Sequence, residues 1–117
     1  MNSGPPFSAL ISHQGATVIV RVAGELDLAS SPRLQTTIVD LISGPPLHLT
    51  IDLTDLAFAD LSGLRALDAV GHDVSRAGAR FCLIGVKPYL LRIMQVAEFG
   101  DLERACETTT VQLQPGG

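Results

Sequence analysis

Residues 52–64, with the sequence DLTDLAFADLSGL, decide the fold of this chain, because they join a strand to the start of a helix. Apolar and polar residues alternate over residues 47–53, which is typical of a strand with one buried face. Residues 54–59 are predicted to form a connecting loop. A helix is expected to begin near Asp60, whose short carboxylate side chain suits an N-cap position.

The flanking sequence continues the alternation of strands and helices. A strand is expected at 17–22, followed by a helix with Ser31 as its side-chain cap and Pro32 at its first position, which Gly44 stops. The helix that begins near Asp60 is expected to end at Gly78, before a strand at 80–86. A helix from Pro88 to Gly100, a short strand at 102–106 and weak helical character at 107–114 complete the chain. Strands that alternate with helices predict an α/β fold, in which the helix-linked strands run parallel.

The length of 117 residues predicts a single domain. The chain is 46% hydrophobic, which is enough apolar material for one core. Residues 1–15, with three Gly or Pro residues near their start, are expected to be a flexible leader. The folded domain is expected over 16–113, followed by a flexible tail at 114–117.

Composition argues against several classes of partner. The net charge of −4 and the pI near 5.1 disfavour a surface that tracks nucleic-acid phosphates. No apolar run approaches the roughly 18 residues that span a bilayer, so we expect no membrane insertion. The absence of a secretory signal pattern predicts a cytoplasmic protein. Two cysteines are too few for a disulfide framework or a four-cysteine zinc site.

No motif for catalysis, cofactor binding or metal binding is present. The chain has no glycine-rich phosphate loop and no nucleophile elbow. Its three histidines are scattered, so we expect no metal site and no cofactor. Asp52, Asp55 and Asp60 leave two interpretations open: a carboxylate pair for acid–base chemistry, or caps for loops and helices, the commoner use of aspartate at such positions.

The helix start at residues 60–63 is the position best suited to a charged modification. The first backbone N–H groups of a helix are unpaired, and the helix dipole favours negative charge there. These N–H groups and the helix dipole would therefore stabilise a phosphate on a nearby side chain. A capped helix without any modification fits the same residues.

The sequence resembles the STAS domain of bacterial anti-sigma factor antagonists from about residue 17 to 111. Its markers are GELD at 24–27, DL at 52–53, FADLSGL at 58–64, the apolar strand at 81–86 and Pro88 at the head of the following helix. The resemblance implies a small, mixed, mostly parallel sheet with helices mainly on one face. It also implies a protein that binds an anti-sigma factor serine kinase, releases a sigma factor and so regulates transcription.

The position that carries the phosphate in this family is occupied differently here. The family pattern places Ser or Thr directly after the motif aspartate, whereas this chain has Leu61 after Asp60. Ser62 is the neighbouring hydroxyl and is the candidate phosphorylation site. Two interpretations of Leu61 follow: an antagonist that escapes phosphorylation, or a STAS accessory subunit of a membrane transporter or signalling assembly.

We expect the partner surface to comprise a small set of residues around the helix start. The resemblance implies that the acidic Asp27 lies near it, although a loop carboxylate that bonds nearby amides fits Asp27 equally well. The predicted partner-binding residues are Asp27, Asp60, Leu61, Ser62, Gly63 and Leu64. Of these, Leu64 is expected to lie half in the core rather than to be a pure contact. The protein is expected to be a monomer or weak dimer.

The two cysteines also leave two interpretations open. Cys82 lies in the apolar strand, where a buried and inert thiol is expected. Cys106 lies near the last expected strand, and sheet neighbours can bring it close to Cys82. A redox pair is the alternative to two inert thiols.

Overall fold

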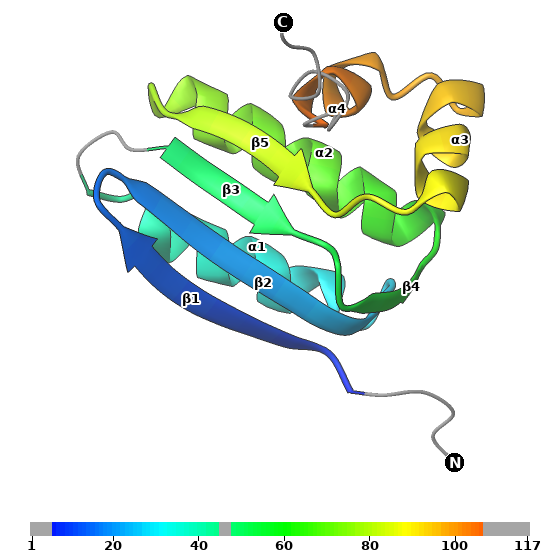
Figure 1. Cartoon of the computed structure of the whole chain (residues 1–117), viewed down its shortest axis with the longest axis horizontal. Helices are drawn as coiled ribbons and strands as arrows, with labels where there is room; N and C mark the ends of the chain where they lie inside the picture. Colours follow the sequence, from blue (N-terminus) through cyan, green and yellow to red (C-terminus); the bar gives the residue numbers. More distant parts are fainter. Residues whose placement is uncertain (1–5, 45–47, 107–117) are drawn as a thin grey trace, which may run out of the picture.

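The computed structural model describes residues 6–44 and 48–106 and shows one α/β domain (Figure 1). The elements are β1 (Ser8–Gln14), β2 (Thr17–Leu26), α1 (Ser31–Leu41), β3 (His48–Asp52), β4 (Leu56–Ala59), α2 (Leu61–Arg76), β5 (Arg80–Ile84), α3 (Pro88–Val96) and α4 (Gly100–Ala105). The predicted α/β class is confirmed.

The sheet is mixed and mostly parallel, as expected. Its main path runs β1-β2-β3-β5, and β4 pairs with the carboxyl end of β2. The β2–β3, β3–β5 and β2–β4 pairs are parallel, and β1 is antiparallel to β2. Helices connect β2 to β3 and β4 to β5, and a helical crossover is what allows two strands to run in the same direction.

The expectation of a flexible leader is wrong for residues 8–14, which form β1 and pair along their whole length with β2. The preceding Phe7 is buried, with the Arg33 guanidinium 5.1 Å from its ring centroid. The strand was missed because it lies at the sheet edge and carries mainly exposed residues, so its sequence shows no alternation. The described residues do not include residues 1–5 of the expected leader, the expected end of the domain at 113 or the expected tail at 114–117.

Two further elements differ from the expectation. Residues 56–59 form the short strand β4 within the expected loop, because the edge of β2 offers them backbone partners. Residues 102–106 are not a strand: helix α4 occupies most of them, and Cys106 alone makes a parallel bridge to Leu83. Gly100 begins α4 rather than ending α3. The weak helix expected at 107–114 lies outside the described residues.

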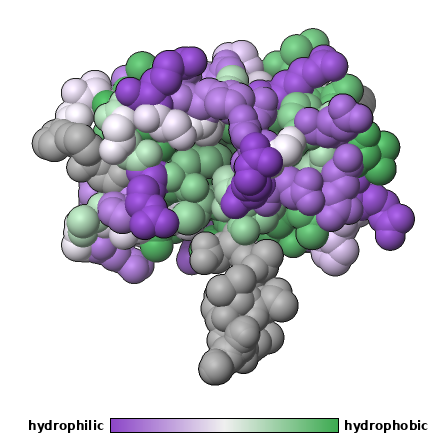
Figure 2. Space-filling view, turned by 90° about the horizontal axis from the view of Figure 1, so that it is seen from above, coloured by the Kyte–Doolittle hydropathy of each residue, from purple (hydrophilic) through white to green (hydrophobic). Residues whose placement is uncertain are grey.

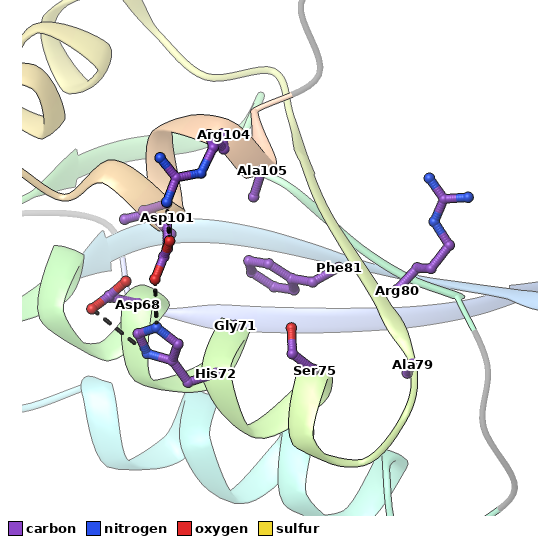
Figure 3. Close-up of a pocket in the computed structure, with 11 residues that line it drawn as sticks. Asp68, Gly71, His72, Ser75, Ala79, Arg80, Phe81, Asp101, Arg104 and Ala105 are labelled. Carbon is purple, nitrogen blue, oxygen red and sulfur yellow. Dashed lines mark hydrogen bonds and ion pairs between the residues drawn. The ribbon is translucent and has the colours of Figure 1, made fainter.

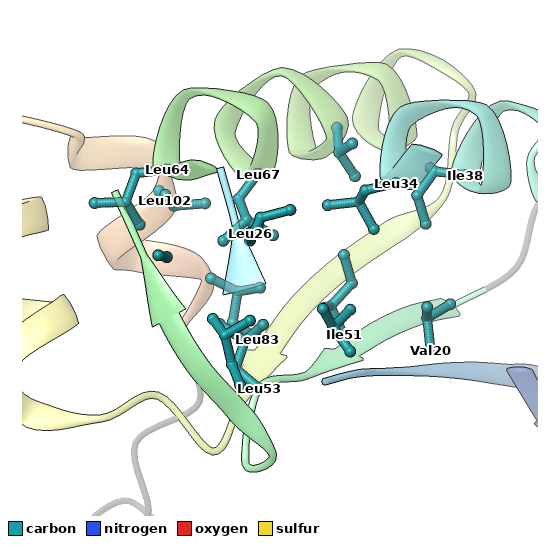
Figure 4. Close-up of a cluster of buried hydrophobic side chains, with 14 of the residues drawn as sticks. Val20, Leu26, Leu34, Ile38, Ile51, Leu53, Leu64, Leu67, Leu83 and Leu102 are labelled. Carbon is teal, nitrogen blue, oxygen red and sulfur yellow. The ribbon is translucent and has the colours of Figure 1, made fainter. Parts of the chain in front are cut away.

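The core lies between the sheet and the two long helices (Figure 4). Alternate residues of β2 and β3 are buried toward α1 and α2, while the opposite face of the sheet is turned toward the viewer in Figure 1. This agrees with the expected packing of helices on one face. The largest fully buried side chains are Leu26, Leu34, Ile38, Leu49, Ile51, Leu53, Leu56, Leu64, Leu67, Leu83, Leu90 and Met94.

Candidate functional site

The N-terminus of α2 is capped as the sequence predicts. Asp60 has extended backbone angles, and its carboxylate accepts a hydrogen bond from the Gly63 N–H at 2.9 Å. The Asp60 N–H in turn donates to the Leu26 carbonyl at 3.3 Å. The helix start is therefore fixed against the end of β2, and one of its otherwise unpaired N–H groups is satisfied.

Gly63 provides the close contact between α2 and β2. A β-carbon at this position would lie 2.2 Å from the Leu26 carbonyl oxygen, far inside normal contact distance. The absence of a side chain thus allows the first turn of α2 to lie directly on the last residue of β2. The loops that carry Asp27 and Asp60 are brought together as a result.

Asp27 organises the turn between β2 and α1. Its Oδ1 accepts hydrogen bonds from the Ala29 and Ser30 N–H groups, both at 3.1 Å. Its carbonyl accepts from the Ser31 N–H at 2.9 Å and from the Ser31 hydroxyl at 2.6 Å. The carboxylate is therefore engaged within its own loop. Ser31 is the first helical residue and bonds backward to Asp27, so it does not cap the helix as expected.

The residues expected to face a partner differ in their exposure. Leu61 is 42% exposed, and Ser62 is half-buried beside a groove between α1 and α2. Gly63 and Leu64 are buried, and Leu64 belongs to the core. The Leu64 side chain therefore supports the surface from below and does not line it. Asp27 and Asp60 hold the two loops that frame this surface.

Sequence reasoning missed two residues of this surface, Leu28 and Arg65. Leu28 is 76% exposed at the tip of the Asp27 turn, and both side chains line the groove beside Ser62. The one sequence feature that could have identified Leu28 is its place directly after Asp27, where an apolar residue stands in a turn. Nothing in the sequence showed that this residue and α2 would meet, because the two loops are more than thirty residues apart.

Two of the three aspartates that could have formed an acid–base pair make structural hydrogen bonds instead. Asp52 accepts hydrogen bonds from the Thr54 N–H at 2.9 Å and from its hydroxyl at 2.6 Å. Burial raises the pKa of Asp52, but the Thr54 hydrogen bonds and the Arg21 charge outweigh it and leave the pKa below its usual value. Asp60 caps α2, and Asp55 is exposed. These contacts favour the capping interpretation over an acid–base pair.

A second cavity, of about 570 Å³, lies among α2, β5 and α4 (Figure 3). The Phe81 ring packs against Gly71 at its floor, where a β-carbon would lie 2.9 Å from the ring. These elements lie at the top of Figure 1. The face seen from above has an apolar strip at its middle with hydrophilic side chains on either side (Figure 2).

His72 lies at the rim of this cavity between two carboxylates. Its Nε2 is 3.0 Å from Asp101 Oδ2 on α4, and its Nδ1 is 3.9 Å from Asp68 Oδ2, one helical turn earlier. The hydrogen bond to Asp101, followed by the charge of Asp68, raises the pKa of His72. The hydrogen bond with His72, followed by the hydrogen bond and the charge of Arg104, lowers the pKa of Asp101. The four-residue spacing between Asp68 and His72 is visible in the sequence. Nothing in the sequence shows that Asp101 lies beside His72, because α4 brings it there.

The cysteines are not joined by a disulfide. Cys106 Sγ lies 3.8 Å from Met94 Sδ and 3.5 Å from the Leu102 carbonyl oxygen. Burial raises the pKa of Cys106 to about 11. Across residues 6–44 and 48–106, no group of three His, Cys, Asp or Glu side chains is arranged to hold a metal ion. No helix in the same residues is long and apolar enough to cross a membrane.

The protein is a small α/β module with its helices mainly on one face of the sheet. The capped start of α2 lies beside the turn that Asp27 orders. The STAS domain family model matches residues 8–112. The chain belongs to the STAS domain family.

Solved structures with this fold include proteins of two kinds. An anti-sigma factor antagonist from Mycobacterium paratuberculosis is 22% identical, with a TM-score of 0.75 and 92% of each chain covered. The anti-sigma factor antagonist SpoIIAA in its unphosphorylated form is 20% identical, with a TM-score of 0.70, 91% of this chain and 93% of that chain covered. The murine anion transporter Slc26a9 is also 20% identical, with a TM-score of 0.67; the match covers 80% of this chain but 16% of the transporter. At these identities the likeness shows the fold.

Proposed function

We propose that this protein is an anti-sigma factor antagonist, a binding module without catalysis of its own. It binds a kinase-type anti-sigma factor, releases a sigma factor and so regulates transcription. It acts in the cytoplasm as a monomer or weak dimer and contacts neither DNA nor the membrane. The acidic net charge and the similarity to antagonist structures over 91–92% of the chain support this proposal.

The observation that carries the proposal is the surface around Leu61. Asp60 and Asp27 fix two adjoining loops, and Leu61 is exposed directly after the cap. In the family pattern this position accepts the phosphate that ends binding. Because leucine has no hydroxyl, we propose that the surface stays competent for binding when the partner kinase has ATP. Ser62 stays the candidate for phosphorylation in this chain, although it opens on the groove between α1 and α2.

The experiment is an affinity purification of the tagged chain from its native lysate, with and without ATP, read by mass spectrometry. Recovery of a small serine-kinase-type anti-sigma factor, retained in the presence of ATP, is the expected result. A Leu61→Asp variant should lose that protein, because a charge would replace the apolar contact. Val96→Asp is the matched control, since Val96 is an exposed apolar residue on a different helix, α3.

A second candidate function is an accessory STAS subunit of a membrane transporter. It is favoured by the match to the anion transporter, in which a STAS domain forms a small part of a longer chain. The same purification distinguishes the two: recovery of transporter subunits, with no anti-sigma factor, would replace the first proposal with the second.

A further inference from the structure

The groove between the first turns of α1 and α2 is a feature that the capped helix start does not explain. It encloses about 320 Å³ and adjoins Leu61 through its neighbour Ser62. One part of its lining is apolar and the other is polar or basic. The lining residues are Leu28, Ser31, Pro32, Gln35, Ser62, Arg65 and Ala66.

Leu28 is an exposed apolar side chain on a rigid support. The Asp27 carboxylate holds the N–H groups of Ala29 and Ser30, and the Ser30 hydroxyl donates to the Glu25 carbonyl at 2.8 Å. The turn that carries Leu28 is therefore ordered before any partner arrives. An exposed apolar residue on a pre-ordered turn loses little conformational entropy on binding, which is the property of an interface anchor.

Arg65 supplies an uncompensated positive charge beside this anchor. Arg21, Arg76 and Arg104 each have an aspartate partner, whereas Arg65 has none among residues 6–44 and 48–106. Its guanidinium is exposed at the groove in a protein of net charge −4. A carboxylate is the group whose charge and geometry a guanidinium pairs with best.

We infer that this groove receives an apolar side chain of the protein partner that lies next to a carboxylate. The apolar group packs against Leu28, Pro32 and Ala66, and the carboxylate pairs with Arg65. The inference rests on the proposed function, because it names the chemistry of the partner at the same surface. It assigns the binding contact to Leu28 and Arg65, two residues outside the predicted site.

The test uses a probe that needs no identified partner. The ¹⁵N-labelled protein is titrated with sodium 4-methylpentanoate, which combines a branched hydrocarbon with a carboxylate. 4-Methylpentanamide and acetate are the comparison probes, because each lacks one of the two groups. We expect saturable amide shifts confined to the groove, with binding at least threefold weaker for either comparison probe.

Two pairs of variants make the test specific. Arg65→Gln should weaken binding of 4-methylpentanoate at least threefold, and the control Arg92→Gln, an exposed arginine on α3, should not change it. Leu28→Ser should weaken it similarly, and Val96→Ser should not. The dispersed amide spectrum of each variant shows that it is folded.

Several results would overturn the inference. These are the lack of saturable shifts at the groove, shifts centred on the His72 cavity, or equal effects of Arg65→Gln and Arg92→Gln. If the purification recovers the anti-sigma factor but the probe does not bind the groove, this inference fails and the proposed function stands. The converse result would leave a groove with the stated chemistry and remove the proposed function.

Discussion

Gly63 lies directly against the backbone of Leu26, and the space for a β-carbon at Gly63 is already occupied by the Leu26 carbonyl oxygen, 2.2 Å away. This contact joins the two loops that frame the proposed surface. Neither residue is exposed, yet together they determine where Leu61, Ser62 and the Asp27 turn stand relative to one another.

Gly63→Ala should therefore destabilise the domain. The obstructing atom belongs to backbone, which cannot rotate away, so α2 must shift from β2. We expect a loss of about 1–3 kcal/mol in the free energy of unfolding, typical of overpacking, measured by urea denaturation. Gly100→Ala is the control, since its nearest contact is the flexible Arg104 side chain at 3.4 Å, and it should change stability by less than about 0.5 kcal/mol. Equal effects of the two substitutions would show that the Leu26 contact is unimportant.

The turn before α1 should depend on the acceptor oxygen of Asp27 rather than on its charge. Asp27→Ala removes the acceptor for two backbone N–H groups and should cost about 1–2 kcal/mol in the free energy of unfolding. Asp27→Asn keeps an oxygen in the same place and should retain most of the stability. Urea denaturation of both variants checks this. A loss in Asp27→Asn as large as in Asp27→Ala would mean that the charge is what matters.

His72 should make the stability depend on pH in a defined direction. The folded-state pKa of His72 lies above the ordinary value of 6.5, so its stabilising effect is fully present below that value. The effect is lost as the pH rises through the folded-state pKa. The stability difference between the parent and His72→Gln should thus shrink from pH 6 to pH 8.5 in urea denaturation. Because the imidazole is exposed to solvent, the difference should be small and should diminish in high salt. A difference that grows with pH would contradict this assignment.

Cys106 should react slowly with thiol reagents in the folded protein. A pKa of about 11 instead of 9.0 leaves about a hundredfold less thiolate at pH 8. Alkylation of Cys106 by iodoacetamide, followed by peptide mass spectrometry, should be much slower in the folded protein than in urea. Peroxide treatment should leave two titratable thiols after denaturation. Loss of both thiols together would instead support a redox pair with Cys82.

Leu61→Ser should restore the family's phosphorylation switch if the partner is a kinase. The new hydroxyl stands at the exposed position directly after the Asp60 cap. Incubation with the purified partner and ATP should add one phosphate to this variant at residue 61, read by mass spectrometry. Val96→Ser is the control, because it places an exposed serine on α3, away from the acceptor position and from the groove. An active partner that leaves Leu61→Ser without added phosphate would rule out this assignment.

The elements that the sequence predicts well are those whose own residues form a local hydrogen bond or alternate between buried and exposed positions. The α2 cap was predictable because an aspartate three residues before a glycine N–H forms a local bond. The central strands β2 and β3 were predictable because one face of each is buried. By contrast, β1 and β4 are held by hydrogen bonds to β2, and their own side chains are mostly exposed or too few to show a period.

The amino-acid sequence by itself determined the α/β class, the family and the helix start at Asp60, because these depend on local bonds and on hydrophobic period. The tertiary structure alone decided which residues form the surface. Leu28 and Arg65 meet at one groove, and His72 meets Asp101, only because crossover connections bring distant loops and helices together.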